Sequence, residues 1–110
     1  MPASPPTKRS MALEVRFSQE ATDDLFEIWL HIARDSSADR ADLVEAGLRA
    51  SCLKLDHFPE RGSPHDELEP GLRSIPSERR ATIYYRVTGG AVEIVRIRYA
   101  GRDVGSLFGA

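Results

Sequence analysis

The sequence predicts an α+β fold in which a helical hairpin packs on one face of a small, mainly antiparallel sheet. Three observations lead to this class. The stretch from Arg80 to Asp103 reads as a β-hairpin around Gly89 and Gly90. Two segments with helical periodicity precede it, and the join between them is short. An alternating segment begins at Leu13, so the predicted order is β-α-α-β-β-β, with the opposite face of the sheet left open.

The chain of 110 residues is long enough for one domain that needs no disulfide or metal to hold it together. We expect residues 1–10, rich in Pro and Ser, to form a disordered tail and residues 11–110 to form the domain, with Met11 as an alternative start. The single cysteine, Cys52, favours a reduced, cytoplasmic setting and reads as a small buried residue rather than a nucleophile. No apolar run is long enough to cross a membrane.

The first half of the chain supplies one strand and two helices. Residues 13–17 alternate apolar and charged side chains, as a half-buried strand does. Ser18 is placed to cap a first helix that ends near residues 35–37, and acids fill its first turn, where the helix dipole favours them. A second helix follows from about Ala38. Its predicted apolar face consists of Val44, Leu48, Cys52 and Leu55.

The second half supplies the remaining strands. The segment from Phe58 to Pro64 ends the second helix, because it contains two prolines and a glycine, and a loop continues to Gly71. A short strand is expected at 72–75 and a turn at 76–78.

The register of the hairpin follows from its turn. With Gly89 and Gly90 as the turn, Thr88 lies opposite Ala91 and each further pair follows one step outward. One face is then nearly all apolar and is predicted to face the core; it consists of Ile83, Tyr85, Val87, Val92 and Ile94, with Arg96 and Arg98 at its far end. The other face pairs Arg86 with Glu93, Tyr84 with Val95, Thr82 with Ile97, and Arg80 with Tyr99.

This second face is half apolar and half basic, which makes it a candidate docking face as well as an ordinary amphipathic strand face. The charge distribution supports docking. The net charge of −2 conceals an acidic helical part and a C-terminal part, residues 71–110, that holds seven arginines and three acids. A basic face suits an anionic partner, either a nucleic acid or an acidic peptide.

Little in the sequence points to catalysis. His31, His57 and His65 all lie outside the basic hairpin, so a histidine acid/base pair is not expected there. The acids around His65 lack a recognised metal-ligand spacing, and we expect no metal site and no cofactor. The arginines that bracket the sheet serve either as a clamp for phosphate or carboxylate groups or as ion-pair partners of the acidic helices. They are Arg73, Arg80, Arg86, Arg96, Arg98 and Arg102.

Several short motifs together resemble the ParE branch of the RelE/ParE toxin superfamily, over roughly residues 13–108. The final motif departs modestly from the family, which usually has His where this chain has Tyr99. The motifs are residues 21–25 with Ile28, Leu55 with Phe58-Pro59 and Gly62, residues 70–73, residues 83–87, residues 93–97 and residues 101–103.

The resemblance implies a toxin of a type II toxin–antitoxin system, but the superfamily has two activities. RelE-type members cut messenger RNA on the ribosome with basic residues on the sheet and a C-terminal tyrosine. Here Arg73 and Arg102 match basic positions, whereas Ile75, Thr82 and Phe108 replace a lysine, an arginine and the tyrosine. Losing these groups disfavours catalysis, so the chain fits ParE-type members better. These are associated with poisoning DNA gyrase without nuclease chemistry.

We therefore expect a gyrase-inhibiting binder rather than an enzyme, neutralised by a ParD-like antitoxin in a hetero-oligomer, with no specific nucleic-acid binding of its own. The alternatives are a RelE-like endonuclease that uses Arg73 and Arg102, and a non-toxic partner-binding module. Expected target contacts are Arg102, Val104 and Phe108. Expected antitoxin contacts are Arg80, Tyr84, Arg86, Val95, Ile97 and Tyr99.

Overall fold

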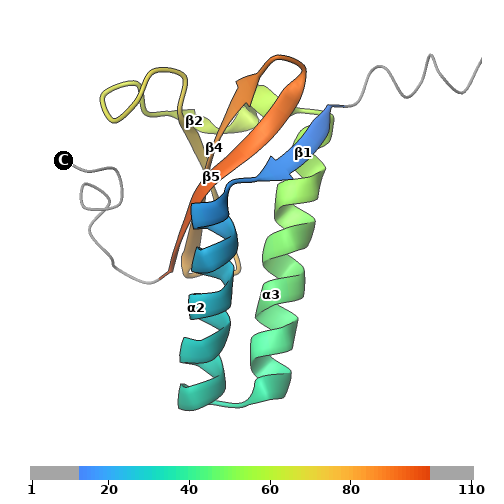
Figure 1. The fold of residues 1–110 in the computed structure, drawn as a ribbon, viewed down its shortest axis with the longest axis vertical. Coiled ribbons are helices and arrows are strands. Elements are labelled where there is room, and N and C mark those ends of the chain that lie inside the picture. Colours follow the sequence, from blue (N-terminus) through green and yellow to red (C-terminus); the bar gives the residue numbers. More distant parts are fainter. Residues whose placement is uncertain (1–12, 100–110) are drawn as a thin grey trace, which may run out of the picture.

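The computed structural model describes residues 13–99, and it shows two antiparallel helices packed against a five-stranded mixed sheet (Figure 1). The α+β class and the predicted order are confirmed, with one additional two-residue strand, β2. The strand order in the sheet is β1-β5-β4-β3-β2, and β1 pairs parallel to β5. The elements are β1 Glu14–Phe17, α2 Gln19–Asp35, α3 Ala38–Leu53, β2 Ser63–Pro64, β3 Arg73–Ser77, β4 Ala81–Thr88 and β5 Ala91–Tyr99.

Both helices begin at a serine cap. The Ser18 side chain accepts a hydrogen bond from the Ala21 N–H at 3.0 Å, and the Ser37 side chain accepts one from the Arg40 N–H at 3.1 Å. Each cap satisfies an N–H that the first helical turn leaves unpaired. In the part of the chain that the structure describes, neither helix is long and apolar enough to span a membrane.

The core lies between the helix pair and one face of the sheet. The predicted apolar face of the second helix is buried there, and so are four of the five hairpin residues assigned to the core. The first helix buries Ala21, Leu25, Ile28 and Ile32, whereas Phe26 of the same helix is 61% exposed. Val87 is the exception: it is 39% exposed, at the end of the hairpin near the turn. The largest fully buried side chains are Leu25, Leu48, Leu55, Leu72, Ile83, Tyr85 and Ile94.

The β4–β5 hairpin turns where the two glycines predict it. Gly89 and Gly90 have φ angles of 50° and 83°, a region that glycine enters at little cost. The predicted register holds from the turn as far as the Tyr85–Ile94 pair.

A β-bulge then changes the register, and the predicted pairs beyond it are wrong. Val95 is the extra residue, so Tyr84 lies opposite Arg96 rather than Val95. In the same way, Ile97 pairs with Ile83 and Tyr99 pairs with Ala81. Because a shift of one residue moves side chains to the other face, Ile97 and Tyr99 lie on the helix side of the sheet.

The connection from β3 to β4 also differs from the prediction. Strand β3 continues through Pro76 to Ser77, and the turn is formed by Glu78 and Arg79, with φ angles of 51° and 68°. Proline is tolerated in this strand because β2 pairs only with Arg73 and Ser74, which leaves the other edge of β3 open at Pro76. The residue types proline and serine therefore do not predict the position of this turn.

The start of α2 closes the edge of β5 where β1 stops. Strand β1 pairs with β5 only as far as Ile94. Beyond that point, the Ser18 hydroxyl donates to the Val95 carbonyl at 2.8 Å, and the Ile97 N–H donates to an Asp24 carboxylate oxygen at 2.9 Å. The Arg96 guanidinium donates two further hydrogen bonds to Asp24, each of 2.9 Å. Hydrogen bonding to Asp24 is the main cause that raises the Arg96 pKa.

Replacing Asp24 with alanine is expected to lower the free energy of unfolding by about 2 kcal/mol, because a partly buried guanidinium and a buried strand-edge N–H lose this acceptor together. Urea denaturation followed by circular dichroism measures this. The matched control is Asp23→Ala, since Asp23 is exposed and accepts only from the Gln19 amide. We expect the control to change stability by less than about 0.5 kcal/mol. Equal effects of the two substitutions would contradict the role assigned to Asp24.

Candidate functional site

The outer face of the sheet, on the side away from the helices, carries three of the six predicted antitoxin contacts: Tyr84, Arg86 and Val95. Arg86 and Val95 line a shallow depression together with Glu93 and Arg96. Arg86 donates to Glu93 at 3.2 Å and to Glu69 at 2.9 Å. Its charge is therefore largely balanced within the chain, as the ion-pair interpretation of the arginines predicts.

This face is less open than expected, because the segment between β2 and β3 covers part of it. The His65 ring lies 5.8 Å from the Tyr84 ring, and His65 Nε2 is 2.7 Å from the Ser74 hydroxyl. Tyr84 is only 3% exposed. Replacing Tyr84 would therefore disturb packing before it tested any docking.

The remaining predicted contacts are separated from these three. Ile97 is 3% exposed and belongs to the core, so its assignment to a docking face is wrong. Tyr99 packs at the border of the core, with the Arg80 guanidinium 5.5 Å from its ring centroid. Both corrections follow from the bulge at Val95. The predicted target contacts, Arg102, Val104 and Phe108, lie outside the described residues.

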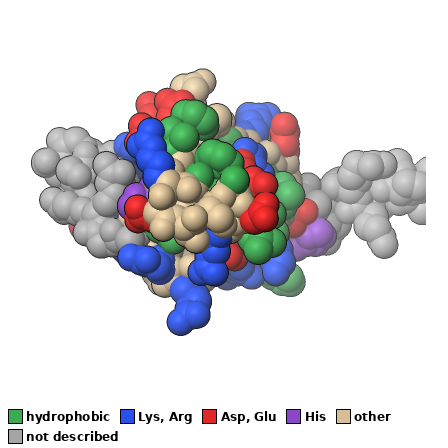
Figure 2. All heavy atoms as spheres, turned by 90° about the horizontal axis from the view of Figure 1, so that it is seen from below, with side chains coloured by type: hydrophobic (Ala, Val, Ile, Leu, Met, Phe, Trp, Pro, Cys, Tyr) green, Lys and Arg blue, Asp and Glu red, His purple; other side chains and the backbone are tan. Residues whose placement is uncertain are grey.

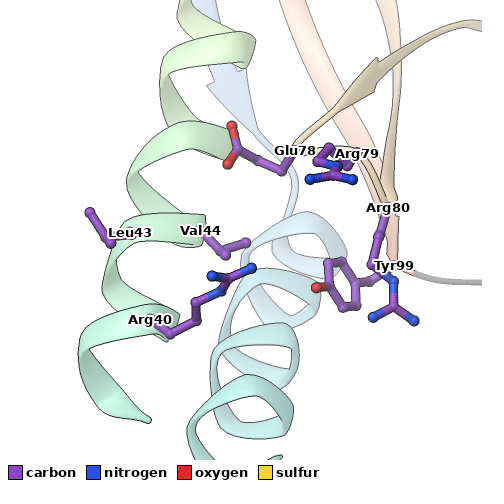
Figure 3. A pocket seen from close by; sticks show the side chains of 7 residues that line it. All are labelled: Arg40, Leu43, Val44, Glu78, Arg79, Arg80 and Tyr99. Carbon is purple, nitrogen blue, oxygen red and sulfur yellow. The ribbon is translucent and has the colours of Figure 1, made fainter. Parts of the chain in front are cut away.

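Arg80 and Tyr99 line a groove between α3 and the β3–β4 turn (Figure 3). The groove has a volume of about 490 Å³. Arg40 and Tyr99 point toward one another across it, and Arg79 lies on the sheet side (Figure 3). Leu43 and Val44 of α3 supply apolar lining, and Leu43 is 71% exposed. Below, the groove formed by Arg40, Leu43, Val44, Arg79, Arg80 and Tyr99 is called the basic groove.

Two contacts fix the turn that borders the basic groove. The Ser77 hydroxyl lies 2.7 Å from the Ser51 hydroxyl of α3. The Glu78 carboxylate rests against the backbone of Gly47, where a Cβ atom would collide with it. Glu78 and Arg79 adopt positive φ without being glycine, a conformation that costs free energy and persists where the surroundings hold it. The contacts to α3 supply that support.

Sequence reasoning missed Arg40 and Arg79. Arg40 lies on the exposed side of the second helix, where arginine is ordinary, and the turn was expected one or two residues too early. The turn has two non-glycine residues at positive φ, and this conformation cannot be predicted from their residue types. Asp24 lies within the motif at residues 21–25, but nothing in its spacing reveals its contact with Arg96.

The residues at positions where RelE-type members have catalytic groups do not form a catalytic group in the described part of the chain. The Arg73 guanidinium donates to the Glu60 carbonyl at 3.0 Å and the Gly62 carbonyl at 2.8 Å, so it binds this chain's own backbone. Ile75 is buried in the core. The Tyr85 hydroxyl accepts from the Gly62 N–H at 2.9 Å, and burial raises the pKa of Tyr85. A buried phenol of raised pKa is a poor proton carrier.

Cys52 is fully buried against the core, as its place on the apolar face of the second helix predicts. Burial raises the pKa of its thiol to about 12. A buried thiol of such pKa is a poor nucleophile near neutral pH. Within residues 13–99, no three side chains of the metal-binding types are grouped around a possible ion.

Comparison with known proteins gives one matching family, and two toxin–antitoxin systems are among the similar solved structures. The family model described as the ParE toxin of the type II toxin–antitoxin system parDE matches residues 15–104. The chromosomal ParDE toxin–antitoxin system from P. aeruginosa is 22% identical with a TM-score of 0.73, over 84% of this chain and 99% of that chain. The toxin–antitoxin complex RelBE2 from Mycobacterium tuberculosis is 21% identical with a TM-score of 0.63, over 84% and 95% of the chains. No curated protein matches the sequence significantly.

The burial of Cys52 predicts slow labelling by Ellman's reagent in the folded protein. At pH 8 a thiol of pKa about 12 is ionised in only about one molecule in ten thousand. We expect labelling at least about a hundred times faster in 6 M urea, where the thiol regains its ordinary pKa. Since the folded pKa is the higher one, the stability contributed by the neutral thiol is present below about pH 8.5 and is lost as the pH rises toward 12. Equally fast labelling with and without urea would show that Cys52 is accessible.

Proposed function

The chain belongs to the ParE family of toxins of type II toxin–antitoxin systems, and we propose that it inhibits DNA gyrase and is neutralised by a ParD-like antitoxin. The toxin acts as a binder rather than as an enzyme. Its target and its antitoxin are both expected in the cytoplasm, which fits the unpaired Cys52.

This proposal rests on the residues that occupy the positions where RelE-type members have catalytic groups. Arg73 is engaged by two backbone carbonyls, Ile75 fills the core, and Thr82 has no charge. Phosphodiester cleavage needs positioned cations and a proton carrier. A binder of a protein target needs neither.

The antitoxin proposal is supported by the family and by the two structural relatives, both described as toxin–antitoxin systems or complexes. The antitoxin would use the accessible parts of the outer sheet face around Arg86 and Val95. It would also contact the Arg80 and Tyr99 side chains on the opposite side. Together these offer apolar area and cationic groups for an amphipathic acidic segment. Toxin and antitoxin then form a hetero-oligomer.

A second candidate is a ribosome-dependent endonuclease that uses Arg73 and Arg102. The similarity in fold to the RelBE2 complex is compatible with it, but at 21% identity that similarity shows the fold alone. A third candidate is a partner-binding module without toxicity. The first experiment below separates all three.

Induced expression in a bacterial host is expected to arrest growth, with loss of negative supercoiling in a reporter plasmid and intact messenger RNA. The reason is that inhibiting gyrase changes DNA topology without cutting messenger RNA. Arrest accompanied by codon-phased cleavage of messages would establish the endonuclease instead. Normal growth at high expression would leave the non-toxic module.

The residues assigned to the target are tested by Arg102→Ala combined with truncation before Val104. This variant is expected to lose growth arrest by at least about tenfold in plating efficiency while it still binds the antitoxin, because hot spots of an interface carry most of the affinity. Antitoxin binding in titration calorimetry is the control for folding. Undiminished arrest by the variant would remove the assignment.

A further inference from the structure

We propose that the basic groove is a docking site for an acidic stretch of the antitoxin, in which carboxylates contact Arg40 and Arg79 while apolar side chains lie against Leu43 and Tyr99. This inference rests on the proposed function, because it assumes an antitoxin. It goes beyond that proposal by moving the main charged contact from the outer sheet face to the groove at α3.

Charge is the first argument. Among the described residues, the groove is lined by three arginines and by one acid, Glu78, whose carboxylate is turned against Gly47 of α3. Arg40 and Arg79 are exposed. Arg86, on the outer face, is instead already paired with two acids. A partner carboxylate therefore finds more uncompensated positive charge in the groove than on the outer face.

The shape and stiffness of the site are the second argument. A volume of about 490 Å³ lies within the range that accepts several side chains. The turn that presents Arg79 and Arg80 is held to α3 through Ser77 and Glu78. Little conformational entropy of the backbone is therefore lost when a ligand binds. Seen from the end where the helices join, several basic side chains gather along one side of the molecule (Figure 2).

The lining favours an acidic peptide over a nucleotide or a nucleic acid. A stacked base would have to compete with Arg80, whose guanidinium already lies 5.5 Å from the Tyr99 ring centroid. Phosphate alone would leave the apolar lining of Leu43 and Val44 without a partner. An amphipathic acidic segment uses both kinds of lining.

The test is titration calorimetry of the full-length toxin with the protein encoded by the reading frame adjacent to its gene. The double variant Arg40→Glu with Arg79→Glu is expected to weaken binding at least about tenfold, because it places like charges against the ligand. Lys54→Glu is the control. Lys54 is also exposed but follows the end of α3 that is farthest in sequence from Arg40 and lines neither the groove nor the outer-face depression, so we expect less than about a twofold change.

The outcomes separate the inference from the proposed function. If the wild-type toxin binds and the double variant, folded by circular dichroism, binds equally well, the groove assignment is wrong while the antitoxin proposal stands. If the wild-type toxin does not bind that protein, both are wrong. A wild-type complex displaced by ATP or by an oligothymidylate at millimolar concentration would identify the groove as a phosphate site and overturn the acidic peptide.

Discussion

The contact of the Asp24 carboxylate with Arg96 and the Ile97 N–H is the constraint on which the rest of the structure depends. Strand β1 is short, so the far half of β5 would otherwise present an unpaired edge under the helices. A carboxylate from the first helical turns satisfies that edge and fixes how α2 lies along the sheet. The position of α3, and with it one side of the basic groove, follows from α2 through the helical hairpin.

The arginine-rich C-terminal part is not a uniformly basic face, although its composition suggests one. Arg96 and Arg86 are used in ion pairs within the chain, and Arg73 holds two backbone carbonyls. These side chains stabilise the fold and order the segment between β2 and β3. The exposed arginines of the basic groove lie at the β3–β4 turn and at the start of α3, which are far apart in sequence but share one groove.

The parts of the fold that repeat a simple pattern could be predicted, and the irregular parts could not. Helical periodicity, the serine at position 18 and the pair Gly89-Gly90 each predicted the element that the structure has. The bulge at Val95 could not be foreseen, because no residue type demands it, and it transfers Ile97 and Tyr99 to the other face. The turn at Glu78 and Arg79 was missed for a similar reason, since it depends on support from α3 rather than on glycine or asparagine.

The parallel pairing of β1 with β5 has a consequence for synthesis. Ser18 and Val95, which share a hydrogen bond, are 77 positions apart, so the sheet closes only after almost the whole domain has been translated. Until then the helices have no complete surface to pack on, and β1 has no strand beside it. A nascent or prematurely terminated chain cannot assemble the groove or the outer face. The order of strands therefore withholds the groove and the outer face from the cell until β5 has been translated.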